Sequence, residues 1–266
     1  MIDKTAKIPI LILVFIHLFN PFAVLAAESS HMPVISIIID DIGYRSIDDR
    51  NALALPGPIT FAVMPHAPNV ASFTRLAATS GKDIILHLPM EAVEQKKNRF
   101  LGPGGLTRSM NEVQFIATLI YDLRSVPNII GVNNHMGSLL STDKEKIGWL
   151  MDYLHSKKVF YIDSVTTGHS VAAYAAINSD VPYLRRDVFL DNSTDPVAIN
   201  AQFDELIRMA RQNGSAIAIG HPHPETIEVL AKKLGNLAEY GVRLVSVKSL
   251  ISEQGNTMLV KNVSLN

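Results

Sequence analysis

Short apolar runs, rich in β-branched residues, recur along this chain and alternate with segments of helical periodicity. Six such runs lie at 34–39, 59–64, 84–88, 129–132, 159–162 and 216–219. Most of them do not alternate apolar with polar residues, and strands of this kind are buried on both faces, as in parallel sheets. Strand–helix alternation also implies right-handed crossover connections. The pattern therefore predicts an α/β fold with mostly parallel strands.

Three of the intervening segments carry signals for the start of a helix. Ser or Thr followed three residues later by Glu is typical of a capping box, which predicts helices that begin at Ser109 and Thr142. A third helix is predicted to begin after Asp195, with Pro196 in its first position and Gly214 at its end. These helices connect the predicted strands.

No linker or shift in composition divides residues 33–252, so they are predicted to form one domain. A closed or nearly closed β/α barrel fits the alternation best, and an open doubly wound sheet is the alternative. The segments 89–108 and 164–170 resemble neither strands nor core helices, and such loops often shape a substrate cleft. Residues 253–266 are predicted to be a weakly ordered tail.

The first residues differ in kind from the rest. Lys4 and Lys7 precede an apolar stretch that reaches residue 25, and Ala26 and Ala27 follow it. This order predicts a signal peptide over residues 1–27 and an exported protein, periplasmic or secreted, that meets the membrane only through this segment. An uncleaved membrane anchor is the alternative. The chain has no cysteine, so disulfides do not stabilise it.

The overall charge argues against one class of partner. The formal net charge is −1, and the 24 Lys and Arg residues are scattered along the chain. Binding to a phosphate backbone requires clustered basic residues. No nucleic-acid partner is therefore expected.

Acidic and imidazole side chains occur where the predicted strands end. They are Asp40, Asp41, His87, His135, Asp163, His221 and His223. Because the carboxyl ends of parallel strands face one crevice, these side chains are expected to converge. Core filling does not explain so many ionisable strand ends.

The adjacent carboxylates Asp40 and Asp41 repel each other unless one binds a cation or shares a proton. The pair is therefore interpreted as one metal ligand and one general base. The alternative is that Asp41 only caps a turn. His87 lies between two leucines, and Glu91 follows four residues later as a possible second ligand. His135 lies in a polar run without amphipathic pattern, which favours a functional role.

Two prolines flank His223 in Gly220-His221-Pro222-His223-Pro224 and restrict the backbone there. His221 is therefore a candidate metal ligand or general acid. Arg186 and Asp187 follow Arg185 and either anchor an anion, orient Asp40 or form a solvated charge cluster.

Five motifs in order resemble the divergent polysaccharide deacetylase family, a branch of the NodB-like carbohydrate esterases. They are Ile-Asp-Asp-Ile-Gly, His-Leu-Pro-Met-Glu, Asn-Asn-His-Met-Gly-Ser, Arg-Arg-Asp-Val-Phe-Leu-Asp and Ala-Ile-Gly-His-Pro-His-Pro, within residues 33–250. The resemblance implies an irregular β/α barrel that removes acetyl groups from amino sugars with a divalent metal. It also implies that Asp40 and Asp41 supply a base and a ligand.

By the same resemblance, His87 corresponds to the first ligand histidine and His221 to the general acid. Glu91 stands where a second ligand histidine is usual, and the stretch with His135 replaces an Arg-containing motif. The resulting hypothesis is hydrolysis of an N- or O-acyl group on a carbohydrate outside the cytoplasm. Asp41, His87 and His135 would hold Zn²⁺, Asp40 would be the base and His221 the acid.

In this hypothesis His223 or Asp163 would orient His221. A second hypothesis keeps the fold without catalysis, as a periplasmic glycan- or partner-binding protein, because the ligand pattern departs from that of the better-studied enzymes. A third, an amidohydrolase-like enzyme, rests on the pair His221 and His223. In that superfamily, however, the His-x-His pair follows the first strand.

Overall fold

The computed structural model describes residues 32–253. The predicted signal peptide and residues 254–266 of the predicted tail lie outside the described residues. The strands are β1 (Val34–Ile42), β2 (Thr60–Val63), β3 (Asp83–Met90), β4 (Gly131–Met136), β5 (Phe160–Asp163), β6 (Tyr183–Arg185), β7 (Val188–Phe189), β8 (Ser215–Gly220) and β9 (Arg243–Leu244). The helices are α1 (Ser46–Leu53), α2 (Val70–Thr79), α3 (Glu112–Ser125), α4 (Lys144–Lys157), α5 (Ala172–Asn178), α6 (Pro196–Asn213) and α7 (Pro224–Leu234), with short 3₁₀ helices η1 (Gln95–Phe100) and η2 (Leu140–Thr142).

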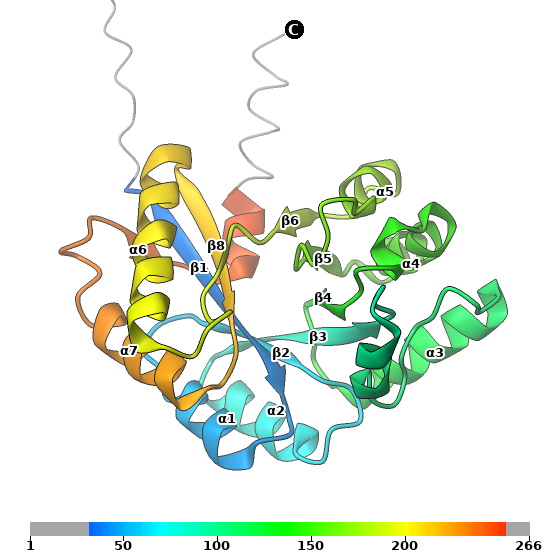
Figure 1. Ribbon diagram of the computed structural model, residues 1–266, viewed down its shortest axis with the longest axis horizontal. Helices are drawn as coiled ribbons and strands as arrows, with labels where there is room; N and C mark the ends of the chain where they lie inside the picture. Colours follow the sequence, from blue (N-terminus) through cyan, green and yellow to red (C-terminus); the bar gives the residue numbers. More distant parts are fainter. Residues whose placement is uncertain (1–31, 254–266) are drawn as a thin grey trace, which may run out of the picture. The chain divides into compact units, whose positions relative to one another are not determined.

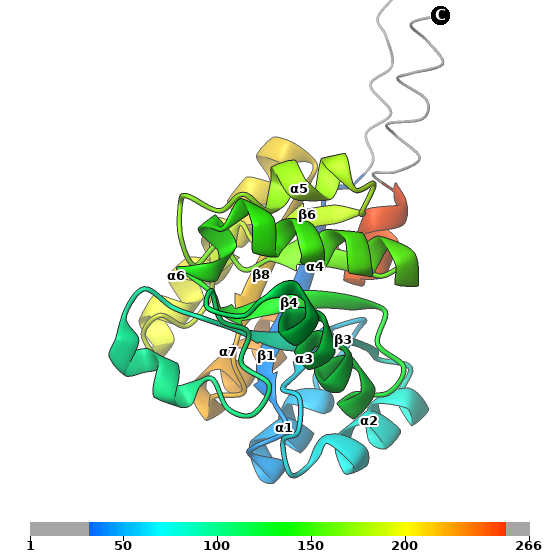
Figure 2. The same cartoon turned by 90° about the vertical axis from the view of Figure 1, so that its right-hand side faces the viewer.

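All strand pairs are parallel, in the order β6-β5-β4-β3-β2-β1-β8-β7, and β9 pairs with the beginning of β1. The sheet curls into an incomplete barrel, and the helices lie on its outer side (Figure 1). From another side, α3, α4 and α5 are seen packed one against the next (Figure 2). The predicted α/β barrel of mostly parallel strands is confirmed (Figure 1).

The two edge strands, β6 and β7, belong to one continuous stretch of chain. Arg186 N donates a hydrogen bond to Asp163 O beside β6, whereas Asp187 N donates to Ile217 O beside β7. Two consecutive residues therefore bond to opposite ends of the sheet. The barrel is neither regularly closed nor an open doubly wound sheet, because this crossing replaces direct pairing of β6 with β7.

The inner face of the barrel changes from apolar to polar along β1, β3 and β8. The part toward the amino ends of the strands is filled by buried side chains such as Ile38, Ile85 and Ile219. Side chains two residues apart on a strand point to the same face. The next inward positions on β1 and β3 are therefore Asp40 and His87, and the alternation on β8 brings His221 to the same level. Burying the apolar layer thus places the polar layer at the carboxyl edge.

Two strands continue further than their apolar runs. β3 continues to Met90 and β4 to Met136, beyond the predicted runs 84–88 and 129–132. His87 lies within its strand, as predicted, but the prediction that His135 follows the fourth strand was wrong, because β4 includes it. Backbone pairing between His87 and Asn133, and between Pro89 and His135, continues the ladder through this polar segment.

The helix starts differ from the predicted capping boxes by one or two residues. Helix α3 begins after Asn111, whose side chain forms a reciprocal capping box with Gln114, and Ser109 is not its cap. Helix α4 is capped by Asp143, not by Thr142. The Asx side chain next to each helix satisfies the free N–H groups that the predicted caps do not reach.

The third predicted helix start is confirmed. Asp195 accepts a hydrogen bond from Val197 N, Pro196 occupies the first turn, and Gly214 ends α6 with φ 83°. Of the helices formed by residues 32–253, none combines the length and the apolar character that crossing a membrane requires.

Candidate metal centre

A β-bulge in β1 brings two adjacent carboxylates to one edge of the barrel. The register with β2 shifts between Ile39 and Ile42, and Asp41 has φ 59°. An extra residue in the ladder breaks the alternation of side chains, so Asp41 joins Asp40 at the inner side instead of pointing outward. Gly43 follows with φ 122°, and a Cβ there would lie 2.6 Å from Ala67 Cβ.

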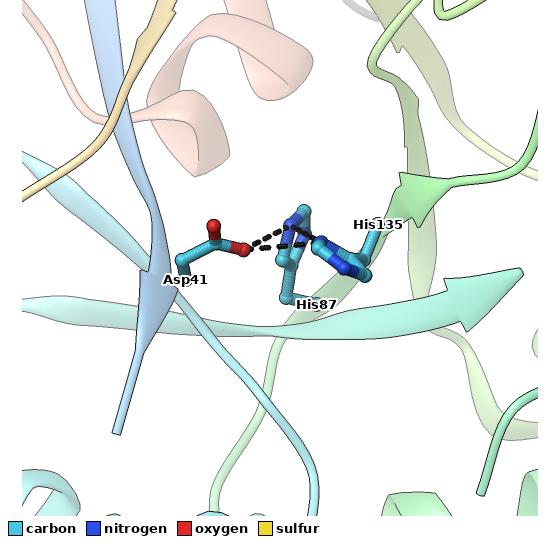
Figure 3. Close-up of side chains that lie close together, drawn as sticks. All are labelled: Asp41, His87 and His135. Carbon is cyan, nitrogen blue, oxygen red and sulfur yellow. Dashed lines mark hydrogen bonds and ion pairs between the residues drawn. The ribbon is translucent and has the colours of Figure 1, made fainter. Parts of the chain in front are cut away.

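Three potential ligand atoms converge from three strands. Asp41 Oδ1 lies 3.2 Å from His87 Nε2 and 3.1 Å from His135 Nδ1. The two ring nitrogens are 3.1 Å apart. Figure 3 shows the side chains pointing toward one another from β1, β3 and β4. The structure thus brings together the three residues that the sequence analysis assigns to a metal.

The spacing and the donor atoms fit a divalent ion. Ligand atoms about 2.0–2.1 Å from a zinc-sized ion lie roughly 2.8–3.4 Å from each other, from adjacent octahedral to tetrahedral positions. The observed separations of 3.1 to 3.2 Å fall within this range. Asp41 Oδ1 is buried and has no correctly oriented hydrogen-bond donor among the described residues. A buried carboxylate oxygen without a donor is costly unless a cation satisfies it.

The electrostatics of Asp41 agree with this role. Burial opposes its ionisation, but the adjacent His135 and His87 rings hold the pKa of this carboxyl well below its usual range. Asp41 is therefore an anionic donor between two imidazoles. One carboxylate with two imidazoles is a set that zinc and other first-row ions accept.

The Asn133 side chain joins a ligand to the neighbouring carboxylate. Its Oδ1 is 2.8 Å from His87 Nδ1, and its Nδ2 donates to Asp40 Oδ1 at 2.8 Å. The amide oxygen accepts only, so Nδ1 of His87 carries the proton and Nε2 keeps its lone pair for the cluster. Asn133 is fully buried, and its orientation is further set by a 3.4 Å contact with Ser164 Oγ.

Asp40 lies beside Asp41, His87 and His135 but is not one of the three candidate metal ligands. Its Oδ2 is 3.6 Å from His87 Nε2, and its side chain is buried. Burial raises the pKa of Asp40, and His87, His221 and the Asn133 amide only partly oppose this effect. A buried carboxylate with a raised pKa is a stronger base than one in water.

His221 faces the three candidate ligands, Asp41, His87 and His135, from the side opposite to Asp40. Its Nε2 is 3.8 Å from Asp41 Oδ2, and its Nδ1 is 2.9 Å from Asp191 Oδ1. Asp191 Oδ2 accepts hydrogen bonds from His221 N at 2.7 Å and from Thr226 Oγ1 at 2.8 Å. Burial alone would lower the pKa of His221, but the Asp191 hydrogen bond and the Asp41 and Asp40 charges raise it to about 9. The imidazole is therefore cationic at neutral pH and can give up a proton.

Several predicted supporting residues have other roles. Asp163 does not orient His221: it lies on the face of β5 opposite to inward-facing Ile162, and its Oδ1 and Oδ2 accept from Val165 N and Ser170 Oγ. It anchors the 164–170 segment. Glu91 is not a ligand, because the chain turns away after β3 and its Oε2 accepts from Arg108 N at 2.7 Å.

His223 does not contact Asp191 through a hydrogen bond, and its Nδ1 faces Arg45 Nη1 at 3.4 Å. It nevertheless lies near Asp191 and His221 in a second group of possible ligand atoms. The two oxygens of Asp191 already accept three hydrogen bonds, so this second group fits an ion less well than the first.

Arg186 is half-buried, whereas Arg185 and Asp187 are exposed, and hydrogen bonds to the backbone hold Arg186 and Asp187 in place. Arg186 donates to the carbonyl oxygens of Ser164 and Val165, and its charge acts on Asp40 from a distance. Asp187 accepts from Ile217 N at 2.8 Å. Both residues stabilise the crossing between the edge strands.

Comparison with known proteins shows the family of this chain. The family model described as divergent polysaccharide deacetylase matches residues 37–251. The chain belongs to this family. An uncharacterized protein of Escherichia coli (strain K12), YibQ, is 36% identical over 236 residues, which cover 87% of this chain and 72% of that protein.

Solved structures have the same fold as this chain, which confirms the predicted NodB-like fold. An uncharacterized protein from Agrobacterium tumefaciens C58 has a TM-score of 0.80 at 21% identity, covering 84% of this chain and 91% of that one. A CE4 family pseudoenzyme from Bacillus anthracis has a TM-score of 0.51 at 10% identity, covering 83% of this chain and 66% of that one.

The sequence analysis missed two site residues, Asn133 and Asp191. Both stand two positions from another inward-facing residue, because Asn133 precedes His135 on β4 and Asp191 follows Phe189 of β7. Asp191 also ends the Arg-Arg-Asp-Val-Phe-Leu-Asp motif. The alternation of faces along each strand was the available signal, but it requires the strand boundaries to be known.

Proposed function

We propose that this protein is a metal-dependent hydrolase that removes N- or O-linked acyl groups from a polysaccharide or cell-wall glycan outside the cytoplasm. The observation that carries the proposal is the triangle of Asp41, His87 and His135, with a base and an acid on its two sides. Membership of the polysaccharide deacetylase family supports the carbohydrate substrate. The predicted signal peptide supports the location.

Asp41, His87 and His135 would hold the ion, with Zn²⁺ as the expected metal. When bound, such an ion polarises an acyl carbonyl and makes water more acidic. Asn133 fixes the tautomer of His87 and the direction of Asp40 with one amide. The chain therefore supplies a rigid donor set and a base that cannot rotate away.

Asp40 is the general base of the proposed reaction. It accepts the proton from the attacking water while the new C–O bond forms at the acyl carbon. Its Oδ1 is held by Asn133, and its Oδ2 is near the ligand cluster. Burial, which raises the pKa of Asp40, favours the transfer.

His221 is the general acid. The bond from the acyl carbon to nitrogen or oxygen breaks, and His221 Nε2 gives its proton to the departing atom. The products are a carboxylic acid and a free amine or hydroxyl on the sugar. Asp191 keeps the imidazole oriented through Nδ1 and stabilises its positive charge before the transfer.

The alternative is a glycan- or partner-binding protein on the same fold. It is favoured by the fold neighbour that is a CE4 family pseudoenzyme and by Glu91 at the place of a usual histidine ligand. The alternative requires no proton transfer by Asp40 or His221. The two functions therefore differ in what happens when either residue loses its ionisable group.

The test uses the full chain loaded with Zn²⁺ and oligomers of N-acetylated or O-acetylated sugars. We expect release of acetate that stops on chelation and returns when Zn²⁺ is added back. The D40N variant keeps the three ligands, so it should retain the metal and lose turnover by at least about 100-fold.

Stoichiometric Zn²⁺ without release of acetate from any acylated oligomer would overturn the enzyme proposal in favour of the binding protein. Release of acetate that is unaffected by D40N would overturn the assignment of the base.

A further inference from the structure

An open cleft of about 490 Å³ extends from the candidate metal centre to the surface. Its wall beyond Asp41 and His135 is formed by Tyr44, Phe100 and Met136, with Met64 beside them. Tyr44 and Phe100 are 47% and 59% exposed. Large aromatic surfaces left open beside a reactive centre are suited to the apolar faces of sugar rings.

The polar side chains of the cleft mouth are mainly basic. Arg45, Lys97 and His223 line it, and Asp41 is the one carboxylate among the described lining residues. Because that carboxylate faces His87 and His135, it is assigned to the ion. The part of the cleft that is free to meet a substrate therefore presents cationic groups.

Arg45 is held at the cleft by its neighbour. Its Nη1 lies 3.4 Å from Nδ1 of His223, which follows β8, whereas Arg45 follows β1. A guanidinium donates only, so Nδ1 of His223 is the acceptor in this contact. Further N–H groups of the guanidinium stay available, and two parallel donors match a carboxylate or a phosphate.

Lys97 comes from η1 on the other side of the cleft. Its Nζ lies 3.0 Å from Glu94 Oε2, and the two side chains are 61% and 59% exposed. An exposed ion pair of this kind contributes little to stability, because water screens it. Lys97 can therefore leave its ion pair with Glu94 and bind an anion in the cleft with little loss of free energy.

We propose that the glycan recognised here is anionic, with a carboxylate or phosphate substituent on or next to the acylated sugar. The sugar rings lie against Tyr44 and Phe100, and Arg45 and Lys97 bind the substituent. This inference names the substrate class of the proposed hydrolase and rests on that function for its acyl group. The recognition of the anion itself rests only on the cleft.

The experiment compares three N-acetylated oligosaccharides of equal length on the Zn²⁺-loaded full chain. One is a neutral N-acetylglucosamine oligomer, one alternates N-acetylglucosamine with a uronic acid, and one carries phosphate. Calorimetry gives each Kd, and acetate release gives each kcat/KM. We expect at least one anionic oligomer to bind about tenfold more tightly than the neutral one. Whichever anionic oligomer binds more tightly, the one with uronic acid or the one with phosphate, identifies the anionic group that the cleft recognises.

The variants R45Q and K97Q should each remove most of that preference, measured as the ratio of the Kd of the neutral oligomer to the Kd of the anionic oligomer. K96Q is the matched control, because Lys96 is an exposed neighbour on η1 that does not line the cleft. It changes the net charge by the same amount and should keep the preference.

Equal binding of neutral and anionic oligomers would overturn the inference while leaving the hydrolase proposal intact. An equal loss in K96Q and R45Q would also overturn it, since the effect would then be one of overall charge. Selective binding of an anionic oligomer without any acetate release would support the inference and reject the hydrolase.

Discussion

The Nδ1 atom of His221 lies 2.9 Å from Oδ1 of Asp191, whose side chain is fully buried. The same carboxylate accepts hydrogen bonds from the backbone N–H of His221 and from Thr226. One buried anion therefore sets the position, the tautomer and the charge of the imidazole. The pKa of His221 is raised to about 9 by this contact and by the nearby carboxylates, against the effect of burial.

The first prediction concerns the basic limb of the pH profile. His221 gives a proton only while it is protonated, so kcat/KM should fall as pH rises through about 9. In D191N the pKa of His221 should drop toward its ordinary value, and the limb should move to lower pH. We expect a roughly 10- to 100-fold loss at pH 8 and a smaller loss at pH 6. The pH profile and an NMR titration of the imidazole measure this.

T226V is the control for this prediction, because it removes one hydrogen bond to Asp191 and leaves the carboxylate in place. Its limb should stay close to that of the parent. An unchanged titration of His221 in D191N would contradict the argument.

The second prediction concerns the ion. D41A removes the anionic donor of the triangle, so it should abolish both stoichiometric metal binding and turnover. Zn²⁺ at 100 times its Kd should stabilise the parent by about 2.7 kcal/mol and leave D41A unchanged. Metal analysis and thermal unfolding with and without a chelator measure the two effects. Stoichiometric metal retained by D41A would show that the ligand assignment is wrong.

The third prediction isolates the Asn133 amide. N133A removes the acceptor for His87 Nδ1 and the donor for Asp40, so Zn²⁺ affinity should fall by about 10- to 100-fold and turnover should fall as well. S164A removes only the 3.4 Å contact to Asn133 and should have a small effect. Competition with a chromophoric chelator measures the affinity. Equal losses in the two variants would mean that general packing, not the amide, is responsible.

The fourth prediction concerns a buried pair outside the site. Asp122 on α3 is fully buried, its Oδ1 lies 3.0 Å from His66 Nε2, and burial raises its pKa to about 8. The native state therefore keeps a proton that the unfolded chain releases above its ordinary pKa of 3.8. Stability from this group should decline as pH rises toward 8, by up to about 1.4 kcal/mol per unit.

D122N has no proton to lose, so its free energy of unfolding relative to the parent should rise between pH 6.5 and 8. Urea unfolding at several pH values measures the difference. Burial lowers the pKa of His66 below its ordinary value of 6.5, so His66 is mainly neutral in the native state of both proteins across this window. Parallel stability curves for the two proteins would contradict the prediction.

The ordinary sequence patterns were enough to predict the architecture and the convergence of most candidate site residues. Uninterrupted apolar runs indicated parallel strands, and the shared carboxyl edge of such strands predicted that Asp40, Asp41 and His87 converge. His135 and His221 were expected at the same edge for the same reason. These inferences succeeded because burial on both faces and the direction of a strand are expressed locally.

Other features depended on contacts that no local pattern expresses. The bulge that turns Asp41 inward depends on pairing with β2, and Glu91 turns away because the chain after β3 bonds to the backbone near Leu106. The prediction that Asp163 orients His221 was wrong. Asp163 is the neighbour of inward-facing Ile162 on β5, so its side chain lies on the opposite face of that strand.

The parallel α/β barrel and the set of ionisable residues at its carboxyl edge follow from the sequence alone, because hydrophobic periodicity and residue type are local properties. Which partner each of these residues meets is a property of the folded sheet. Asp191 orients His221, and Asn133 links His87 to Asp40, across 30 or more residues of chain. Strand register and curvature bring these partners into hydrogen-bond distance, and both arise from the packing of the whole sheet.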